Sequence, residues 1–451
     1  MLRKGFGVVE MKTRTFHISM AVLLACMAVA VLGFSLDWPR IALPVTSPSY
    51  VTSPSDAADP SDVTSLSAVS SPSAAAGPSE GITEEAILPA PVAQGSTPTK
   101  LFLPLVARNY PPPPPIFGGE MWGIKDSRGL PYAVEAGIHW VRFGAFSWDK
   151  IEPVRTNPPT YHWEVVDEDS LRNASANGLE VIAILRFTPS WAQKFPGSSC
   201  GPIAEEALDE FAEFLTALVR RYSAPPFNVR YWELGNEPDV SVWYDPTVYG
   251  CWGDENDPYY GGGYYAEMLK RAYPAIKAAD PRARVLIGGL LLDCDPANPP
   301  AGKDCKPARF LEGILRNGGG PYFDIVSFHG YPPYSSALRL QWDEHFPPWE
   351  HRGGVVLGKI DFLREVMATY GVNKQIIHTE GSLICPEGNK LDCDPPGTDF
   401  YEAQADYVVW LFVRNWAEGL LGTVWYTFEG PGWRYGSLLD ANQQPKPAWH
   451  A

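Results

Sequence analysis

The stretch VRYWELGNEPDVSVWY, Val229–Tyr244, joins an apolar run to an Asn-Glu-Pro triplet and then to a cluster of aromatic residues. Residues 229–237 have the composition of a buried parallel strand, because such strands read as nearly continuous apolar runs. Pro238 disfavours helical geometry at Glu237, so we expect the chain to leave the strand extended, with the Glu237 carboxylate at the rim. Asn236 beside it can hydrogen-bond a substrate hydroxyl. The stretch therefore predicts a strand whose end carries chemistry.

Seven further runs along the chain have the same character, and helix patterns separate them. The runs are residues 118–124, 139–146, 179–187, 284–292, 323–331, 375–382 and 422–430. In segments 205–222 and 401–419 the apolar residues recur at helical spacing. Eight strand-then-helix units in residues 116–451 are typical of a (β/α)8 TIM barrel, an α/β fold. A doubly wound sheet would carry a Gly-rich nucleotide turn, but the cluster YYGGGYY at 259–265 follows no predicted strand and is predicted to be a flexible loop.

The first 115 residues lack this alternation. Residues 1–40 hold basic residues followed by an uncharged run from Thr15 to Leu36, which predicts either a cleaved export signal or a membrane anchor. Residues 41–115 contain fifteen Pro and many Ser and Ala, a composition that favours a disordered linker. We therefore expect a catalytic barrel at 116–451, secreted or anchored at the outer face of the cell membrane.

The end of the chain departs from the repeating pattern. The last predicted strand is followed by YGSLLDANQQPKPAWHA, residues 435–451, which has no long helix pattern. We expect the last helix to be missing, either because the chain is truncated, which we favour, or because the segment near Leu101 covers the gap.

Charge and cysteine content limit the partners and the compartment. The formal charge is −16, and most of it falls in residues 116–451, which argues against nucleic acid as a partner and favours a neutral or cationic substrate. Cys26 lies in the apolar run, and the remaining six cysteines form an even set that suits an oxidising compartment. Short spacings favour the pairs Cys294–Cys305 and Cys385–Cys393 and leave Cys200–Cys251 by elimination, with free thiols as the alternative. Since no CxxC is present, a structural zinc site is not expected.

The motifs WELGNEP and IIHTEG together resemble the acid/base and nucleophile motifs of the clan A retaining glycoside hydrolases. The resemblance spans about residues 117–451 and implies that Glu237, on the fourth strand, is the acid/base and Glu380, on the seventh, the nucleophile. Trp191, in TPSWA, is similar to the xylosidase and iduronidase branch of the clan rather than to its cellulase branch, although the branch stays open. The other positions that match are Arg142, His329, Tyr331 and Trp425, and we expect these four, with Asn236 and Trp191, to bind substrate.

The chemistry that the resemblance implies is double displacement, without a metal or another cofactor. Glu380 is expected to be ionised, with Arg142 and the Tyr331 hydroxyl as hydrogen-bond partners that lower its pKa. Glu237 is expected to be protonated and to act first as acid and then as base.

Several side chains have a second interpretation. We expect Glu233 to form a structural ion pair, with Arg142 as the candidate partner, and Arg142 can be that partner alone. His329 can be a core histidine, and Trp191, Trp425 and Trp433 either pack or stack on sugar rings. Glu429, in TFEGPG, either binds substrate or lies in a solvated turn.

Two other functions compete with a carbohydrate-cleaving enzyme. A catalytically inactive barrel that binds glycans at the cell surface needs the aromatic residues but not both glutamates. A metal-dependent barrel hydrolase needs His-x-His or clustered carboxylates at strand ends, and the eight histidines have no such spacing. The sequence therefore favours the glycosidase, and the many aromatic residues in loops favour action within chains.

Overall fold

The computed structural model describes residues 115–244, 250–338, 341–386, 393 and 395–451. The predicted signal or anchor and nearly all of the predicted linker lie outside these residues. Within them, no helix combines the length and the apolar composition that crossing a lipid bilayer requires.

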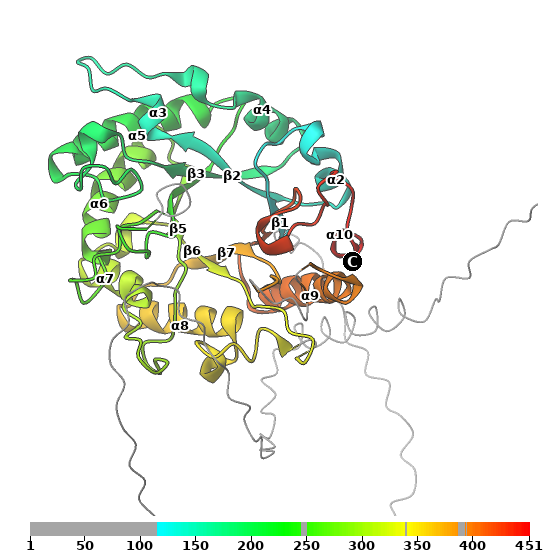
Figure 1. The fold of residues 1–451 in the computed structure, drawn as a ribbon. Coiled ribbons are helices and arrows are strands. Elements are labelled where there is room, and N and C mark those ends of the chain that lie inside the picture. Colours follow the sequence, from blue (N-terminus) through cyan, green and yellow to red (C-terminus); the bar gives the residue numbers. More distant parts are fainter. Residues whose placement is uncertain (1–114, 245–249, 339–340, 387–392, 394) are drawn as a thin grey trace, which may run out of the picture. The chain divides into compact units, whose positions relative to one another are not determined.

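Eight parallel strands close a barrel in which each strand pairs with the next and β8 pairs with β1 (Figure 1). The strands are β1 (Phe117–Glu120), β2 (Trp140–Ser147), β3 (Glu180–Arg186), β4 (Tyr231–Asn236), β5 (Arg284–Gly289), β6 (Ile325–Gly330), β7 (Gln375–Gly381) and β8 (Thr423–Trp425). All eight predicted strands are confirmed, and so is the barrel. The prediction for β8 is too long because Phe428 and Glu429 are buried in the loop that follows it, so that the loop reads like a strand.

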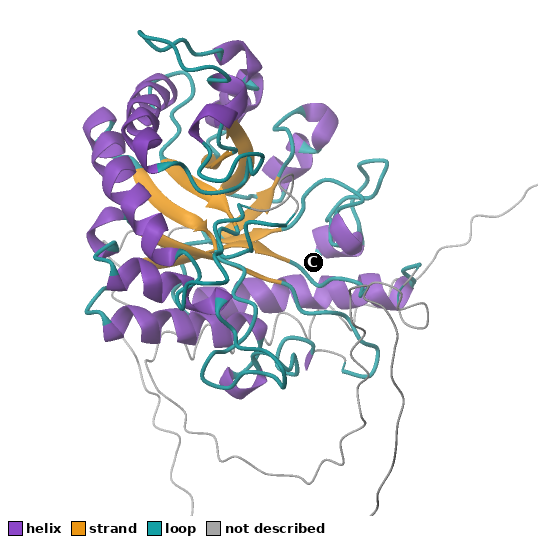
Figure 2. Cartoon of the chain, turned by 60° about the vertical axis from the view of Figure 1, so that its left-hand side comes forward, coloured by secondary structure: helices purple, strands orange, loops and turns teal. Residues whose placement is uncertain are grey.

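Helices surround the barrel (Figures 1 and 2). They are α2 (Leu130–Glu135), α3 (Trp148–Ile151), α4 (Glu168–Ala176), α5 (Leu208–Tyr222), α6 (Gly262–Ala279), α7 (Phe310–Arg316), α8 (Val355–Thr369), α9 (Thr398–Ala417) and α10 (Pro447–His450). The two long helices predicted from periodicity are α5 and α9. The α5 residues Phe211, Phe214 and Leu218 are buried against the core, which stabilises the fold by roughly 1.5 to 3 kcal/mol for each side chain.

One local prediction is wrong, and the end of the described chain carries a short helix. The cluster predicted to be a flexible loop contains the first residues of α6, Gly262 and Gly263. A Cβ on Gly262 would collide with the Phe310 carbonyl, so glycine is needed for α6 to pack closely on α7. The last strand is followed by a short helix, α10, whose Trp449 indole donates to the Tyr132 carbonyl at 3.2 Å.

The barrel interior is built in layers. The lower layer is a cluster of buried apolar side chains, one from each of six strands. They are Trp140, Ile182, Leu286, Ile325, Ile377 and Val424. Because successive strand residues point to opposite faces, the side chains two positions further on also point inward. On β2 and β6 these are Arg142 and Ser327, so a polar layer lies above the apolar one, nearer the carboxyl ends of the strands.

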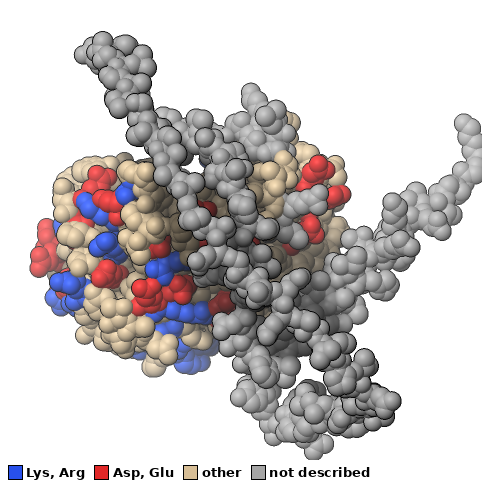
Figure 3. Space-filling model, turned by 90° about the horizontal axis from the view of Figure 1, so that it is seen from below, with Lys and Arg blue, Asp and Glu red and all other residues tan. Residues whose placement is uncertain are grey.

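The loops at the carboxyl ends of the strands carry three disulfides with the predicted pairing. Cys200–Cys251 joins the loop after β3 to the loop after β4, with its Cα atoms 5.2 Å apart. Cys294–Cys305 and Cys385–Cys393 close the loops after β5 and β7, with Cα separations of 5.2 and 5.8 Å. On the face seen in Figure 3, acidic and basic side chains are interspersed.

Candidate active site

A buried arginine organises the polar layer. Arg142, on β2, is fully buried, and its Nε donates to Glu233 Oε2 at 2.6 Å. Its Nη1 donates to Glu120 Oε2 at 2.6 Å and to Glu380 Oε1, and its Nη2 donates to Asn236 Oδ1 at 2.5 Å. Burial by itself lowers the pKa of Arg142, but the surrounding glutamates raise it well above its ordinary value, so the guanidinium stays charged. The predicted ion pair with Glu233 is therefore present, and Arg142 also contacts three side chains at the strand ends.

Glu380 is held by two donors. It is one of the last residues of β7 and pairs in register with His329 of β6, at a point where the register of the two strands shifts. Besides the Arg142 contact, its Oε2 accepts a hydrogen bond from the Tyr331 hydroxyl. Burial raises the pKa of Tyr331 well above its ordinary value, so the phenol keeps its proton and donates it. Both partners of Glu380 are those that the sequence predicted.

Glu237 is positioned by an unusual backbone. Its φ is +52°, so the expectation of an extended exit from β4 is wrong. Its N–H donates to the Gly289 carbonyl at 3.0 Å and its carbonyl accepts from Val240 at 3.2 Å, so a turn begins at the strand end. A left-handed conformation is uncommon for a non-glycine residue and is found most often at functional positions. Burial raises the pKa of Glu237 to about 7, an effect that the charge on Arg142 opposes.

His329 lies between the two glutamates. Its Nδ1 is 2.7 Å from Glu237 Oε1 and 3.5 Å from Glu380 Oε2. Burial lowers the pKa of His329 to about 4, so the ring is neutral at neutral pH. The ring packs on Gly289, where a Cβ would collide with Nε2. His329 is therefore a site residue rather than a core histidine remote from the chemistry.

The two carboxylates lie close together. One carboxylate oxygen of Glu237 and one of Glu380 lie within 4.8 Å of each other. Retaining glycosidases hold their carboxyl groups about 5 to 5.5 Å apart, and inverting enzymes about 6.5 to 9.5 Å apart. The same two oxygens and a His329 nitrogen are also close enough together to hold a cation, so the expectation of a metal-free site stays a prediction.

Three side chains near this pair escaped the sequence analysis. Glu120, the last residue of β1, pairs in register with Arg142, and burial raises its pKa to about 8. Arg186, at the end of β3, and Tyr426, just past β8, are both close enough to interact electrostatically with Glu120 and Glu380. Each lies at or just beyond the last residue of its observed strand, where barrel enzymes carry their active groups, but the predicted strands 118–124 and 422–430 placed Glu120 and Tyr426 inside them.

Two tryptophans predicted to bind substrate are held by contacts within the protein. Trp425 is fully buried, and its Nε1 donates to the Gly436 carbonyl at 2.6 Å, so it exposes no ring face. The ring of the next residue, Tyr426, lies 5.9 Å from the ring of Tyr331, which contacts Glu380. The prediction therefore identified the right strand, but the neighbouring residue faces the glutamate pair. Trp191 packs edge-on against Trp148 at 5.4 Å and donates to the Glu152 carbonyl at 3.0 Å. Its described contacts are structural.

Trp433 is the better candidate for sugar stacking. Its side chain is 45% exposed, and its ring lies edge-on to Tyr331 at 5.2 Å. The two residues after it have left-handed backbones, with φ of +47° at Arg434 and +64° at Tyr435. Hydrogen bonds from Cys385, Gln404 and Lys446 to the carbonyls of these residues hold the turn. Strain held in this way is typical of a preformed binding element.

Glu429 is not in a solvated turn. It is buried, and its carboxylate accepts from the Trp122 N–H at 2.6 Å, which ties the loop after β1 to the loop after β8. Burial raises the pKa of Glu429 to about 7. Trp122 is 50% exposed, as Trp433 is 45% exposed. The hydrogen bond from its N–H to Glu429 therefore fixes the backbone of a second exposed tryptophan.

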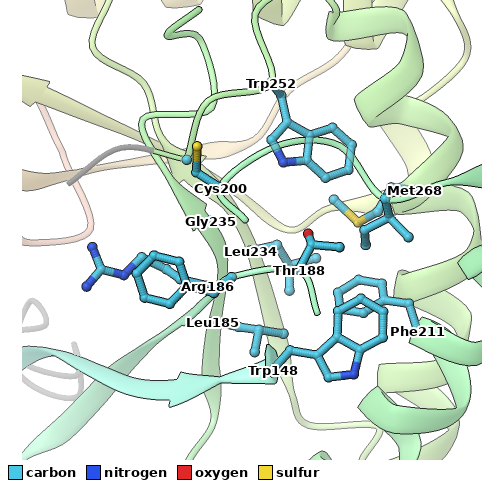
Figure 4. Close-up of a pocket in the computed structure, with 13 residues that line it drawn as sticks. Trp148, Leu185, Arg186, Thr188, Cys200, Phe211, Leu234, Gly235, Trp252 and Met268 are labelled. Carbon is cyan, nitrogen blue, oxygen red and sulfur yellow. The ribbon is translucent and has the colours of Figure 1, made fainter. Parts of the chain in front are cut away.

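A small cavity lies behind the end of β4 (Figure 4). Its volume is about 40 Å³, and its walls come from β3 and β4, the loops that follow these two strands, and α3, α5 and α6. In Figure 4 the Arg186 guanidinium points away from the apolar side chains of Trp148, Leu185 and Phe211. Gly235 borders the cavity with a φ of +98°, and a Cβ there would meet no atom within 4 Å. The constraint at this position is therefore the backbone conformation and not space.

Comparison with known proteins gives the fold. No protein-family model and no curated protein matches the chain in sequence. A family 39 glycoside hydrolase from Bacteroides cellulosilyticus is 18% identical, with a TM-score of 0.51 over 74% of this chain and 62% of that one. A family 39 β-xylosidase from Caulobacter crescentus is 17% identical, with a TM-score of 0.48 over 76% of this chain and 72% of that one. A psychrophilic family 10 endo-β-1,4-xylanase is 16% identical, with a TM-score of 0.46 over 74% of this chain and 95% of that one.

This chain spans less than two thirds of the length of the Bacteroides protein. The barrel closes through eight parallel strands in sequence order, with helices around it. The chain therefore has the (β/α)8 barrel fold that is also found in glycoside hydrolases.

Proposed function

We propose that the chain is a retaining O-glycoside hydrolase that cleaves a polysaccharide or an oligosaccharide by double displacement. The observation that carries the proposal is the facing pair of Glu237 and Glu380, whose oxygens come within 4.8 Å. This proximity is consistent with the short carboxyl separation of retaining enzymes, which attack the anomeric carbon with one carboxylate directly.

In the first step, Glu380 attacks the anomeric carbon and forms an ester as the glycosidic bond breaks. Arg142 and the Tyr331 hydroxyl orient its carboxylate. Glu237, which burial keeps largely protonated below pH 7, gives its proton to the departing oxygen. The leaving group then carries that proton away from the site.

In the second step, water attacks the anomeric carbon of the ester and Glu237 takes the proton. Forming the ester removes the negative charge of Glu380, which lowers the proton affinity of Glu237 and suits it to act as a base. Breaking the ester bond restores the Glu380 carboxylate, and the sugar leaves with its original anomeric configuration.

The side chains around the pair favour a neutral sugar. Asn236 and Tyr426 offer hydrogen-bonding groups at the strand ends, and Trp433 offers a stacking face. The three disulfides suit a protein exported to an oxidising compartment, so we place the substrate outside the cell.

The test is the release of reducing sugar from a panel of β-linked xylans, glucans, mannans and galactans. Glu380→Ala and Glu237→Ala should each lose nearly all activity on whichever glycan the wild type cleaves. Glu267→Ala, which changes an exposed glutamate on α6, should retain it. If the folded wild type binds a glycan and cuts none of the panel, the chain is a glycan-binding barrel instead.

The same assay with a chelator tests the metal-dependent alternative. Activity should survive dialysis against EDTA, because double displacement at two carboxylates needs no metal. Activity that disappears on dialysis and returns with Zn²⁺ or Ca²⁺ would assign Glu237, His329 and Glu380 to a metal site.

A further inference from the structure

A buried lysine on one of the outer helices contacts the backbone beside the polar layer of the barrel. Lys359, on α8, is only 5% exposed. Its Nζ donates to the His329 carbonyl at 2.8 Å and to the Leu291 carbonyl at 2.6 Å. The ammonium therefore links the end of β6 to the loop that follows β5.

Both of these carbonyls belong to residues that hold the Glu237 turn. The His329 ring contacts the Glu237 carboxylate directly. The Leu291 N–H donates to Asp239 at 2.9 Å, and Asp239 lies two residues after Glu237. Lys359 is thus connected to the turn at two side chains, to Glu237 through His329 and to Asp239 through Leu291. Lys359, His329, Glu237 and Asp239 are each at most 5% exposed, and Leu291 is partly buried.

We propose that Lys359 is a positioning residue of the hydrolase: it fixes His329 and the turn from Glu237 to Asp239, and it places a positive charge beside the acid/base glutamate. The proposal rests on the proposed function. A methionine of similar length would fill the same space without the free-energy cost of burying a charge, so packing alone does not explain a lysine here.

The charges around the two groups set the direction of the effect. Four carboxyl groups face Lys359, from the loop after β4, the loop after β5 and the loop before α8: Glu237, Asp239, Asp293 and Asp343. Glu237 in turn faces Arg142, Arg186, Glu233, Lys359 and the neutral His329, with Glu380 opposite. Burial lowers the pKa of Lys359 to about 8, so it is cationic at pH 7 and lowers the pKa of Glu237. Removing this cation should raise the pKa of Glu237.

The experiment compares Lys359→Met with Lys359→Arg, which keeps the charge. Lys270→Met, which alters a surface lysine of α6, is the control. The pH profile of kcat/KM is measured with aryl glycosides of the sugar that wild type hydrolyses. If Lys359→Met does not fold, Lys359→Gln replaces it, since it also removes the charge.

For the neutral variants, the alkaline limb should move up by about one pH unit, the scale expected for the loss of one nearby charge. kcat/KM for a phenol that leaves poorly should fall about tenfold, part of the roughly 10²- to 10⁴-fold contribution of a general acid. A 2,4-dinitrophenyl glycoside needs no proton to leave and should lose less than about twofold. Lys359→Arg should keep the limb of the wild type.

Equal losses with both leaving groups and an unmoved limb would make Lys359 purely structural. If the wild type cleaves no glycoside, the proposed function fails, and the Lys359 contribution is then measured directly. ¹³C NMR of labelled glutamate, with the Glu237 signal assigned by Glu237→Gln, should show a higher pKa of Glu237 in the neutral variant. An unchanged Glu237 titration would overturn the proposal.

Discussion

Glu237 and Glu380 differ in their neighbours although their oxygens come within 4.8 Å. Glu380 faces a guanidinium and a phenol that both donate to it, which orients its carboxylate. Glu237 faces a neutral imidazole, and burial raises its pKa to about 7. Contrasting environments of this kind are how two chemically identical side chains acquire opposite roles.

The first prediction concerns pH. Because Glu237 must be protonated to release the leaving group, kcat/KM should fall as pH rises through about 7. A 2,4-dinitrophenyl glycoside should not show this alkaline limb, since its leaving group departs without a proton. A limb of equal size with that substrate would assign the titration to another group.

The second prediction concerns sugar stacking. Trp433→Ala should raise KM by about 5- to 10-fold and change kcat little, because one stacked aromatic ring contributes about 1 kcal/mol. Trp191→Phe, which alters the packed indole, should leave KM unchanged. If Trp191→Phe raises KM and Trp433→Ala does not, the assignments of the two residues are reversed.

At the scale of an element, the end of β4 combines two left-handed residues, Gly235 at +98° and Glu237 at +52°. Gly235→Ala should destabilise the protein by about 1 to 2 kcal/mol through its backbone alone, and should lower kcat by displacing Glu237. Gly178, between α4 and β3, has a φ of +70° and equal open space. Gly178→Ala should therefore destabilise the fold to a similar degree without affecting kcat, which urea unfolding and steady-state kinetics can measure.

The disulfide between the loops after β3 and β4 gives a second prediction at this scale. It closes a loop of 51 residues, so replacing Cys200 and Cys251 by serine should lower the free energy of unfolding by about 4 kcal/mol. The corresponding change at Cys294 and Cys305, with a separation of 11 residues, should lower it by about 3 kcal/mol. A larger loss from the shorter loop would show that the loops are stabilised by native contacts rather than by chain entropy.

The elements also explain what the sequence could predict. The eight strands were predictable because strands buried on both faces need continuous apolar runs. The length of β8 was not, because the buried Phe428 continues the apolar run into a loop. Likewise, the start of α6 was hidden because its glycines are required by close packing on α7, which a single sequence does not reveal.

In the candidate site, too, some residues could be predicted from the sequence and others could not. Glu237, Glu380, Arg142 and the Tyr331 contact were predictable from motifs at the ends of strands. For Trp425 the sequence contains too little pattern. The strand β8 has only three residues, so its sequence does not show which side chains point into the barrel, and Trp425 was chosen instead of Tyr426. Glu120 was missed because a lone carboxylate in a Gly-rich strand has no motif around it.

At the scale of the whole molecule, the barrel brings together side chains that lie far apart in the sequence. Arg142 and Glu380 are separated by 238 residues and meet because β2 and β7 both contribute to one ring of strand ends. An apolar layer fills the barrel interior beneath them. The fold thus brings Glu380, Glu237 and Arg142 together around one position.

The central claim is that Glu380 becomes covalently attached to the sugar. The most direct test is mass spectrometry of wild type inactivated by a 2-deoxy-2-fluoro glycoside of the sugar that it hydrolyses, followed by peptide mapping. The account predicts one added sugar, on the peptide that contains Glu380, and none in Glu380→Ala. A label on a different residue, or turnover that gives the inverted anomer without any trapped intermediate, would contradict it.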